Sequence, residues 1–146
     1  MLNRTKIAIL SAVSNLIWFI LTFIWNRQRI APIGGEELAR AWGVYLLVLV
    51  VGFLVLDALS AILIMTIEKR AGGQGFEEKT DERDRYIEGH ATKTFRWVFF
   101  LSFLVALVLL VMGLGFQTFF YALAFTVLLA DLGMWITYII GYERGL

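Results

Sequence analysis

Long apolar runs alternate with short charged segments along the whole chain. Four runs stand out, at residues 7–25, 42–67, 95–112 and 117–140. An α-helix rises about 1.5 Å per residue, so roughly 20 apolar residues cross the hydrocarbon core of a bilayer, which is about 30 Å thick. The pattern therefore predicts an all-α membrane protein, a bundle of four transmembrane helices.

The order of these runs predicts three regions. Residues 1–70 form a first transmembrane hairpin, residues 71–94 a charged cytoplasmic linker or helix, and residues 95–146 a second hairpin. Asp57 and Asp131 lie 74 positions apart in a chain of 146 residues, each about a dozen residues before a Glu that ends its run. This similarity indicates a parallel internal duplication, with the hairpins related by a pseudo-twofold axis along the membrane normal. Coincidence between two apolar sequences is the alternative.

The positions of Lys and Arg predict the orientation in the membrane. Ten of the 13 basic residues fall in the N-terminal segment, the central segment and the C-terminal tail, and only Arg27, Arg29 and Arg40 fall between the first two runs. Because cytoplasmic loops are enriched in basic residues, both termini are expected inside, in a cell inner membrane. The first run is about 19 residues long, which exceeds the usual 7–15 residues of a signal-peptide core, so we expect it to be retained.

Composition limits the chemistry that the chain can perform. There is no cysteine, the only histidine is His90, and the net charge of +1 gives no field for nucleic acid. No nucleophile–histidine arrangement or metal motif occurs. We therefore expect no enzymatic activity, no catalytic residue, no cofactor, no bound metal and no nucleic-acid partner.

Polar residues inside the predicted spans are the first candidate site: Asp57, Asp131, Asn15 and Ser60. Both acids fall near the bilayer midplane, and Asn15 shares one helix face with Ser11, Trp18 and Thr22. An acid facing lipid costs about 2.5 kcal/mol or more, so these groups are expected to converge inside the bundle, with at least one acid protonated at neutral pH. Two interpretations remain open. The acids either hold helices together through neutral hydrogen bonds or exchange protons or bind a cation.

Two further patterns concern packing. Aromatic residues near the span ends are expected to anchor the helices at the membrane interface; they are Trp18, Trp25, Trp42, Tyr45, Trp97, Phe119 to Tyr121, Tyr138 and Tyr142. Small residues form a stripe along the fourth span that permits close approach of another helix; they are Ala122, Thr126, Ala130, Gly133, Thr137 and Gly141.

The second candidate site is the charged motif that precedes the third span. Its residues are Asp81, Glu82, Arg83, Asp84, Arg85, Glu88 and His90. The third helix is expected to extend upstream through them, with a break or bend at Gly89. Three roles remain open: arginines that bridge to acids or lipid headgroups, a docking surface for a cytoplasmic protein, and a divalent-ion site built from Asp81, Asp84, Glu88 and His90.

The motif also carries a family resemblance. Asp81-Glu82-Arg83-Asp84, followed by Tyr86-Ile87 and Ala91-Thr92 before a hydrophobic helix, resembles a family of uncharacterised small prokaryotic four-span membrane proteins. The mark of that family is an Asp-Glu-Arg motif before the third transmembrane helix. The resemblance implies the fold and topology and no particular activity.

Two functions are compatible with these patterns. The first is a non-enzymatic membrane protein that self-associates or serves as an accessory subunit, with the lipid bilayer, a second copy or another membrane protein, and a cytoplasmic protein as partners. The second is a small proton- or cation-coupled transporter or channel that uses Asp57 and Asp131.

Overall fold

The computed structural model describes residues 3–70 and 82–144, and these residues fold into four helices. They are α1 (Asn3–Ile30), α2 (Glu36–Arg70), α3 (Glu82–Val111) and α4 (Gly115–Arg144). Each is long and apolar enough to cross a membrane. The predicted fold class, an all-α membrane protein with four spans, is confirmed. Every helix extends several residues beyond the apolar run that predicted it, because charged residues continue the helices past the hydrocarbon.

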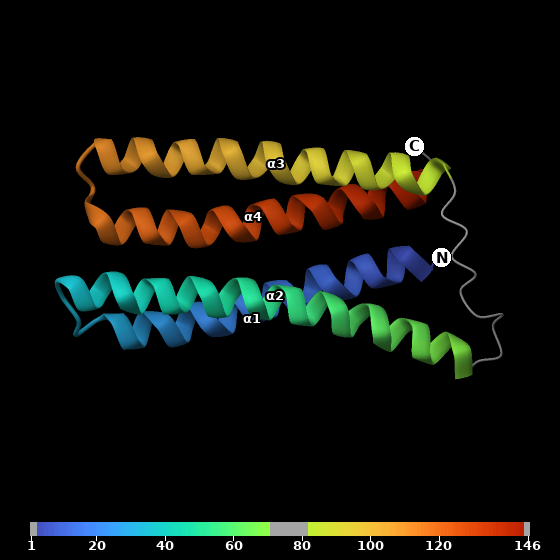
Figure 1. The fold of residues 1–146 in the computed structure, drawn as a ribbon, viewed down its shortest axis with the longest axis horizontal. Coiled ribbons are helices and arrows are strands. Elements are labelled where there is room, and N and C mark those ends of the chain that lie inside the picture. Colours follow the sequence, from blue (N-terminus) through green and yellow to red (C-terminus); the bar gives the residue numbers. More distant parts are fainter. Residues whose placement is uncertain (1–2, 71–81, 145–146) are drawn as a thin grey trace.

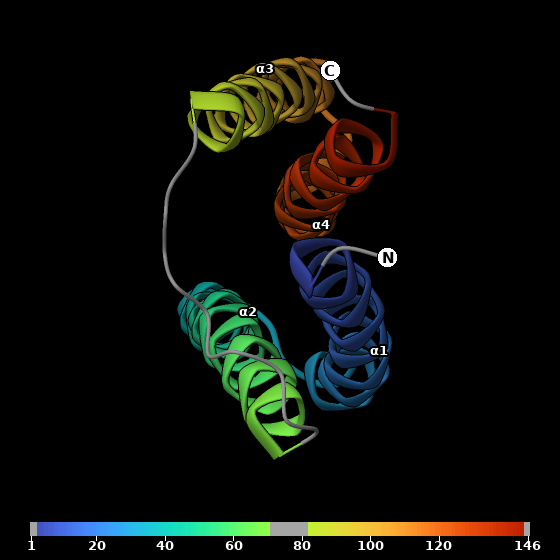
Figure 2. The ribbon, with the colours of Figure 1, turned by 90° about the vertical axis from the view of Figure 1, so that its right-hand side faces the viewer.

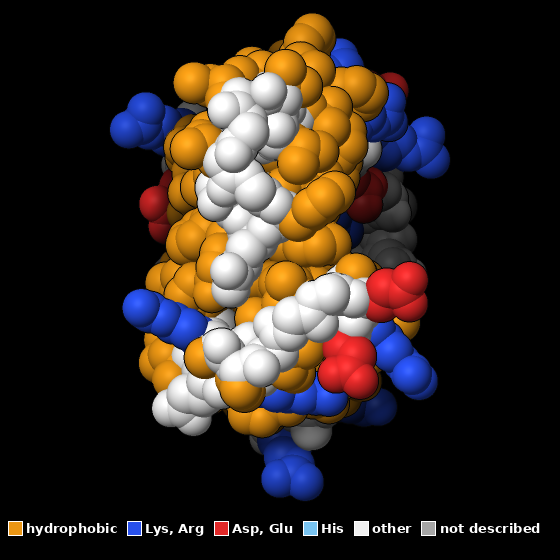
Figure 3. Space-filling model, turned by 90° about the vertical axis from the view of Figure 1, so that its left-hand side faces the viewer, with side chains coloured by type: hydrophobic (Ala, Val, Ile, Leu, Met, Phe, Trp, Pro, Cys, Tyr) orange, Lys and Arg blue, Asp and Glu red, His pale blue; other side chains and the backbone are white. Residues whose placement is uncertain are grey.

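The helices run back and forth, so α1 and α2 form one hairpin and α3 and α4 the other (Figure 1). The start of α1, the end of α2, the start of α3 and the end of α4 lie at one end of the molecule, and the two short turns lie at the opposite end (Figure 1). Seen from the turn end, hydrophobic side chains cover most of the surface and charged side chains gather near its edge (Figure 3).

The turn between α3 and α4 is built on two glycines in the left-handed region. Gly113 has φ 77° and Gly115 has φ 86°. The amide of Leu114 donates to Leu109 O at 3.3 Å and the amide of Gly113 donates to Leu110 O at 3.0 Å. This pair of bonds is a Schellman motif, which satisfies the last carbonyls of α3. The tight antiparallel turn that the glycines predict is therefore present.

The four helices form an open arc in which α1 and α4 are neighbours in the middle (Figure 2). Helix α2 packs on α1 and α3 packs on α4, while no described Cα atom of α2 lies within 8 Å of one in α3. An exact twofold axis relating the hairpins would bring α2 to α3 as closely as α4 comes to α1. The described helices thus depart from that symmetry, and the duplication stays a prediction from the sequence.

Two glycines permit close helix approach. A Cβ atom at Gly52 of α2 would overlap the indole ring of Trp18 of α1, and one at Gly141 of α4 would lie 2.8 Å from Cγ2 of Ile87 in α3. Gly133 also faces α3, where its missing Cβ would lie 3.4 Å from Cγ2 of Val98. Gly133 and Gly141 of the small-residue stripe therefore pack against the partner helix of the same hairpin.

The expectation that Trp42 and Tyr45 are interfacial anchors is wrong. Both side chains are fully buried. The Trp42 ring stacks on Phe120 of α4 at 5.6 Å between centroids and meets Tyr121 edge-on at 4.7 Å. Both rings belong to the buried hydrophobic cluster formed by α1, α2 and α4, and the indole N–H of Trp42 has no hydrogen-bond partner among the described residues. Trp25 and Trp97 are exposed, as an anchoring role requires.

Helix α3 runs without interruption through Gly89, so the expected break there is absent. The charged motif from Glu82 onward and the third span form one helix. Residues 71–81, which include the glycine-rich segment and Asp81, lie outside the described residues.

The contact between Gly52 and Trp18 gives a first prediction. Replacing Gly52 with Ala should destabilise the protein by about 1–3 kcal/mol, because the added methyl group overlaps the Trp18 indole. Thermal unfolding in detergent, followed by circular dichroism, measures the effect. Gly43→Ala, in the same helix with no atom within 4 Å of its Cβ position, is the matched control and should be neutral or slightly stabilising. Equal loss of stability in both variants would contradict this packing.

Candidate functional site

A line of polar side chains on α1 faces the interior of the bundle. Ser11, Asn15, Thr22 and Asn26 are all buried. Their spacing of four, seven and four residues keeps them on one side of a helix with 3.6 residues per turn. The face that the sequence predicts is therefore the buried one, and Asn26 extends it by one more turn.

The side-chain amide of Asn15 joins the two acids. Its Nδ2 donates one hydrogen bond to Oδ1 of Asp57 and another to Oδ2 of Asp131, each at 3.0 Å. An amide NH2 carries two hydrogens, so both donors are used. The two carboxylate oxygens can be no farther apart than twice that distance. Residues from α1, α2 and α4 thus meet at one point, and we call Asn15, Asp57 and Asp131 the amide–carboxylate cluster.

Burial differs between the two acids. Asp131 is only 6% exposed, whereas Asp57 is partly exposed. The hydroxyl of Ser11 lies near Asp57 and the indole N–H of Trp135 lies near Asp131. Oγ of Ser11 and Oδ1 of Asn15 are buried and form no direct hydrogen bond. The cluster therefore holds unused hydrogen-bonding capacity in addition to its carboxylates.

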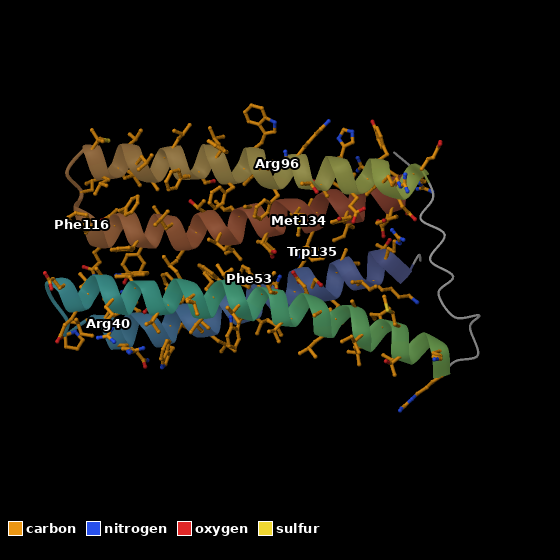
Figure 4. All side chains as sticks on the ribbon, viewed as in Figure 1. Arg40, Phe53, Arg96, Phe116, Met134 and Trp135 are labelled. Atoms are coloured by element: carbon orange, nitrogen blue, oxygen red, sulfur yellow. The ribbon has the colours of Figure 1, made fainter. Side chains whose placement is uncertain are left out.

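A cleft of about 550 Å³ opens beside the cluster, between α2 and α3 with α4 behind. Most of its wall is apolar and includes Phe53 of α2 and Met134 of α4, both labelled in Figure 4. Its lining consists of Val50, Phe53, Leu54, Asp57, Thr92, Phe95, Phe99, Val127, Asp131 and Met134. The only charged groups among these residues are the two acids, so the cleft is negative if either carboxylate is ionised.

This arrangement favours a positively charged guest. An ionised carboxylate in an apolar site is stable only when paired, and two that share a single amide donor also repel each other. Among the described residues, no basic side chain lines the cleft to compensate them. A proton or a cation bound at the cluster would remove both costs.

Ser60, the fourth predicted intramembrane residue, lies elsewhere. Its side chain is buried one turn along α2 from Asp57. It lines a separate depression between α1 and α2 together with Ser14 and Thr66. The structure therefore brings together three of the four predicted intramembrane residues.

Residues of the charged motif, at the start of α3, contact the start of α1 and the end of α4. The guanidinium of Arg83 donates to the carbonyl oxygens of Gly141 and Tyr142 at 3.5 and 3.4 Å, near the end of α4. Asp84 pairs with Arg4 of α1 at 3.2 Å, and Arg4 also donates to the hydroxyl of Tyr142 at 3.1 Å. This supports the structural role of the motif, and we call these four residues with Gly141 the end clasp.

The other motif residues take no part in the clasp contacts just given. Arg85, Glu88 and His90 are exposed, and the His90 ring lies 4.5 Å from that of Tyr86. Within residues 3–70 and 82–144, no three His, Asp or Glu side chains gather in a way that could hold a metal ion. Asp81, a proposed ligand, lies outside these ranges.

The chain matches no protein-family model, no curated protein and no solved structure. The resemblance based on the Asp-Glu-Arg motif thus stays a prediction. Function has to be argued from the cluster, the cleft and the clasp.

Some residues of the site were not predicted from the sequence. Phe95 and Phe99 stack on one face of α3 with ring centroids 6.1 Å apart, and they line the cleft. Their spacing of four residues was a usable signal, but the same spacing also suits lipid contact. No sequence pattern indicated that Arg4 would contact Asp84 and Tyr142, because these contacts depend on where the start of α3 and the end of α4 lie.

The cluster gives a second prediction. Asn15→Leu should lower stability by about 1–3 kcal/mol, because it leaves the buried Asp131 and the partly exposed Asp57 without their shared donor. Asn26→Leu is the matched control on the same helix, since the Asn26 amide is buried and has no hydrogen-bond partner among the residues that the structure describes. That variant should be neutral or stabilising. Thermal unfolding in detergent compares the two, and a larger loss for Asn26→Leu would contradict the role given to Asn15.

The end clasp gives a third prediction. Arg83→Gln should speed amide hydrogen exchange in the last turn of α4, because the carbonyl groups there lose a charged donor. The free energy of local opening of that turn should fall by about 0.5–1 kcal/mol. Arg85→Gln, two residues away and exposed, should leave the exchange rates unchanged. Equal amide protection in wild type and Arg83→Gln would show that the Arg83 contacts do not stabilise the end of α4.

Proposed function

We propose that this chain is a non-enzymatic membrane protein that exchanges a proton or a cation through the amide–carboxylate cluster, as a small ion-coupled transporter. The observation that carries the proposal is the meeting of Asp57 and Asp131 on one buried amide beside a cleft lined by no basic side chain. If the acids served only as hydrogen-bond links between helices, an open cleft beside them would not be needed. The cleft gives a guest access to them.

The buried polar face of α1 supports a route to the cluster. Thr5 and Ser11 lie on one side of Asn15 along the helix, and Thr22 and Asn26 on the other, all of them buried. Oγ of Ser11 and both polar atoms of the Asn26 amide form no hydrogen bond within the described residues. Such groups in a membrane interior are stable when they bind water, and a line of them is a path along which protons can pass.

The orientation is part of the proposal. The chain ends and the motif lie at the same end of the molecule (Figure 1). Only three of the 13 basic residues, Arg27, Arg29 and Arg40, lie near the two short turns, which favours the cytoplasmic side of a cell inner membrane for the opposite end. In that orientation the end clasp faces the cytoplasm and the two short turns face outward.

The fourth prediction tests ion exchange with purified protein in liposomes. A proton-sensitive dye inside the vesicles reports proton entry driven by a membrane potential, and infrared spectra taken at acidic and neutral pH report protonated carboxyl groups. Wild-type protein should pass protons faster than protein-free vesicles do and should show a carboxyl band that changes with pH. Asp57→Asn and Asp131→Asn should each abolish proton flux and reduce the band, because Asn keeps hydrogen bonding but does not titrate.

Glu88→Gln is the matched control, since it removes an exposed acid from α3 and should change neither readout. Wild-type flux equal to that of empty vesicles would contradict transport. A carboxyl band that persists in the Asp57→Asn, Asp131→Asn double variant would show that the titrating groups lie elsewhere.

Self-association is the second candidate function. It is favoured by the separation of α2 and α3, which leaves the cleft open on one side of a single chain. A helix from a second copy could close that side, and the chain would then act as a subunit or accessory of a larger membrane assembly. Native mass spectrometry from detergent gives the oligomeric state, and a monomer over a wide range of protein concentration would contradict this candidate. The docking of a cytoplasmic protein on the exposed motif residues remains a further prediction.

A further inference from the structure

The dimensions of the cleft suggest a guest larger than an inorganic ion. Its volume is about 550 Å³, within the range of roughly 300–1,000 Å³ that is typical of small-molecule sites. A hard metal ion requires six or more oxygen ligands arranged closely around it. The cleft offers two carboxylates on one side of a mainly apolar space, which matches an organic molecule with one charged group.

The chemistry of the lining gives the sign of that charge. Asp57 and Asp131 are its only charged residues, and Thr92 is the only other polar one. Asn15, whose side chain is fully buried at the cluster, has its Oδ1 acceptor without a partner. Acceptors and negative charge thus dominate the polar part of the site. Anionic guests are disfavoured, and cationic guests are favoured.

Three aromatic rings form part of the apolar wall. Phe95 and Phe99 of α3 form a stacked pair, and Phe53 of α2 also lines the cleft. Phenylalanine faces attract organic cations through the ring quadrupole and also bury apolar groups. The opening lies between α2 and α3, along the side of the bundle, and in a bilayer that side would face lipid. A guest that partitions into lipid can therefore enter sideways.

We propose that the cleft binds a lipophilic monovalent organic cation, with its charge at Asp57 and Asp131 and its apolar groups against Phe53, Phe95 and Phe99. This inference rests on the proposed function and names the class of its substrate. Because the cation and a proton neutralise the same carboxylates, they compete for the cluster. When the organic cation replaces a proton at the cluster, transport of the cation is coupled to transport of the proton.

Competition predicts how binding depends on pH. Lowering the pH protonates the carboxylates and removes the charge that holds the cation, so binding weakens. The groups facing the two acids are Ser11, Asn15 and Trp135, none of which titrates in this range, together with the uncharged side chains of the lining. The pH dependence is therefore assigned to the acid pair.

The fifth prediction is tested with tetraphenylphosphonium on the purified full-length chain in detergent, by isothermal titration calorimetry. Tetraphenylborate has nearly the same shape and the opposite charge, so it is the matched ligand control. Wild-type protein should bind the phosphonium at least about tenfold more tightly than the borate, since the acids attract one and repel the other. Binding of the phosphonium should weaken as the pH is lowered.

Variants locate the site. Asp57→Asn and Asp131→Asn should each weaken phosphonium binding about tenfold or more, and Phe99→Leu by a smaller factor. Ser60→Ala, in the separate depression, should bind as wild type does. The comparison of the two ions on wild-type protein stands even if an Asp variant does not fold.

Several results would overturn the inference. They are no phosphonium binding, equal affinity for the two ions, or unchanged binding in folded Asp57→Asn and Asp131→Asn. If the protein is a dimer and binds no phosphonium, the cleft is filled by a helix of the second copy. If the carboxyl band still titrates and protons still cross when phosphonium fails to bind, only the organic-cation inference falls. If flux and band fail as well, the proposed function falls with it.

Discussion

The two hydrogen bonds from the Asn15 amide hold the centre of this protein together. They connect α1 to a carboxyl group in α2, its partner in the first hairpin, and to one in α4 of the second hairpin. In lipid, helices gain little from the hydrophobic effect when they associate, so packing and hydrogen bonds decide which helices become neighbours. A single amide with donors for both acids places α1 between α2 and α4. Helix α3 is then left at the edge on the other side of α4, and the cleft follows from that order.

The two ends of the bundle are closed by different chemistry. At the turn end, Trp42 of α2 packs against Phe120 and Tyr121 of α4, which joins the hairpins through buried rings. At the other end, Arg4 of α1 pairs with Asp84 of α3. Between them the hairpins meet at α1 and α4, and α2 and α3 stay apart. The acids therefore lie at the level where the bundle is open on one side, which is where a guest can reach them.

The sequence predicted the helices well because a membrane span depends on a local run of residues and not on contacts between distant parts of the chain. A run of about 20 apolar residues has few alternatives in a bilayer, where backbone amides must be satisfied within the segment. Convergence of Asn15 with the two acids was also predictable, since the cost of exposing a carboxyl group to lipid drives it inward. Depth and face could be read from residue spacing alone.

Features that depend on the lateral order of helices were not predictable. Trp42 and Tyr45 have the spacing and position of interfacial anchors, but Trp42 packs on rings of α4 and Tyr45 is buried beside Trp42 in the core cluster. The role of Arg83 likewise depends on the end of α4 lying beside the start of α3. The matching positions of Asp57 and Asp131 suggested equivalent hairpins, but Asn15 has Gly89 at the matching position 74 residues later. One half therefore supplies the donor and both halves supply an acid.

Solid-state NMR of the wild-type chain in lipid bilayers tests the shared amide most directly. With Asn side-chain nitrogen and Asp carboxyl carbon isotopically labelled, the Asn15 amide nitrogen should show through-space couplings to the carboxyl carbons of both Asp57 and Asp131. Coupling to only one of them, or to neither, would contradict the account, because the two acids would then not share a donor and would not form a single site.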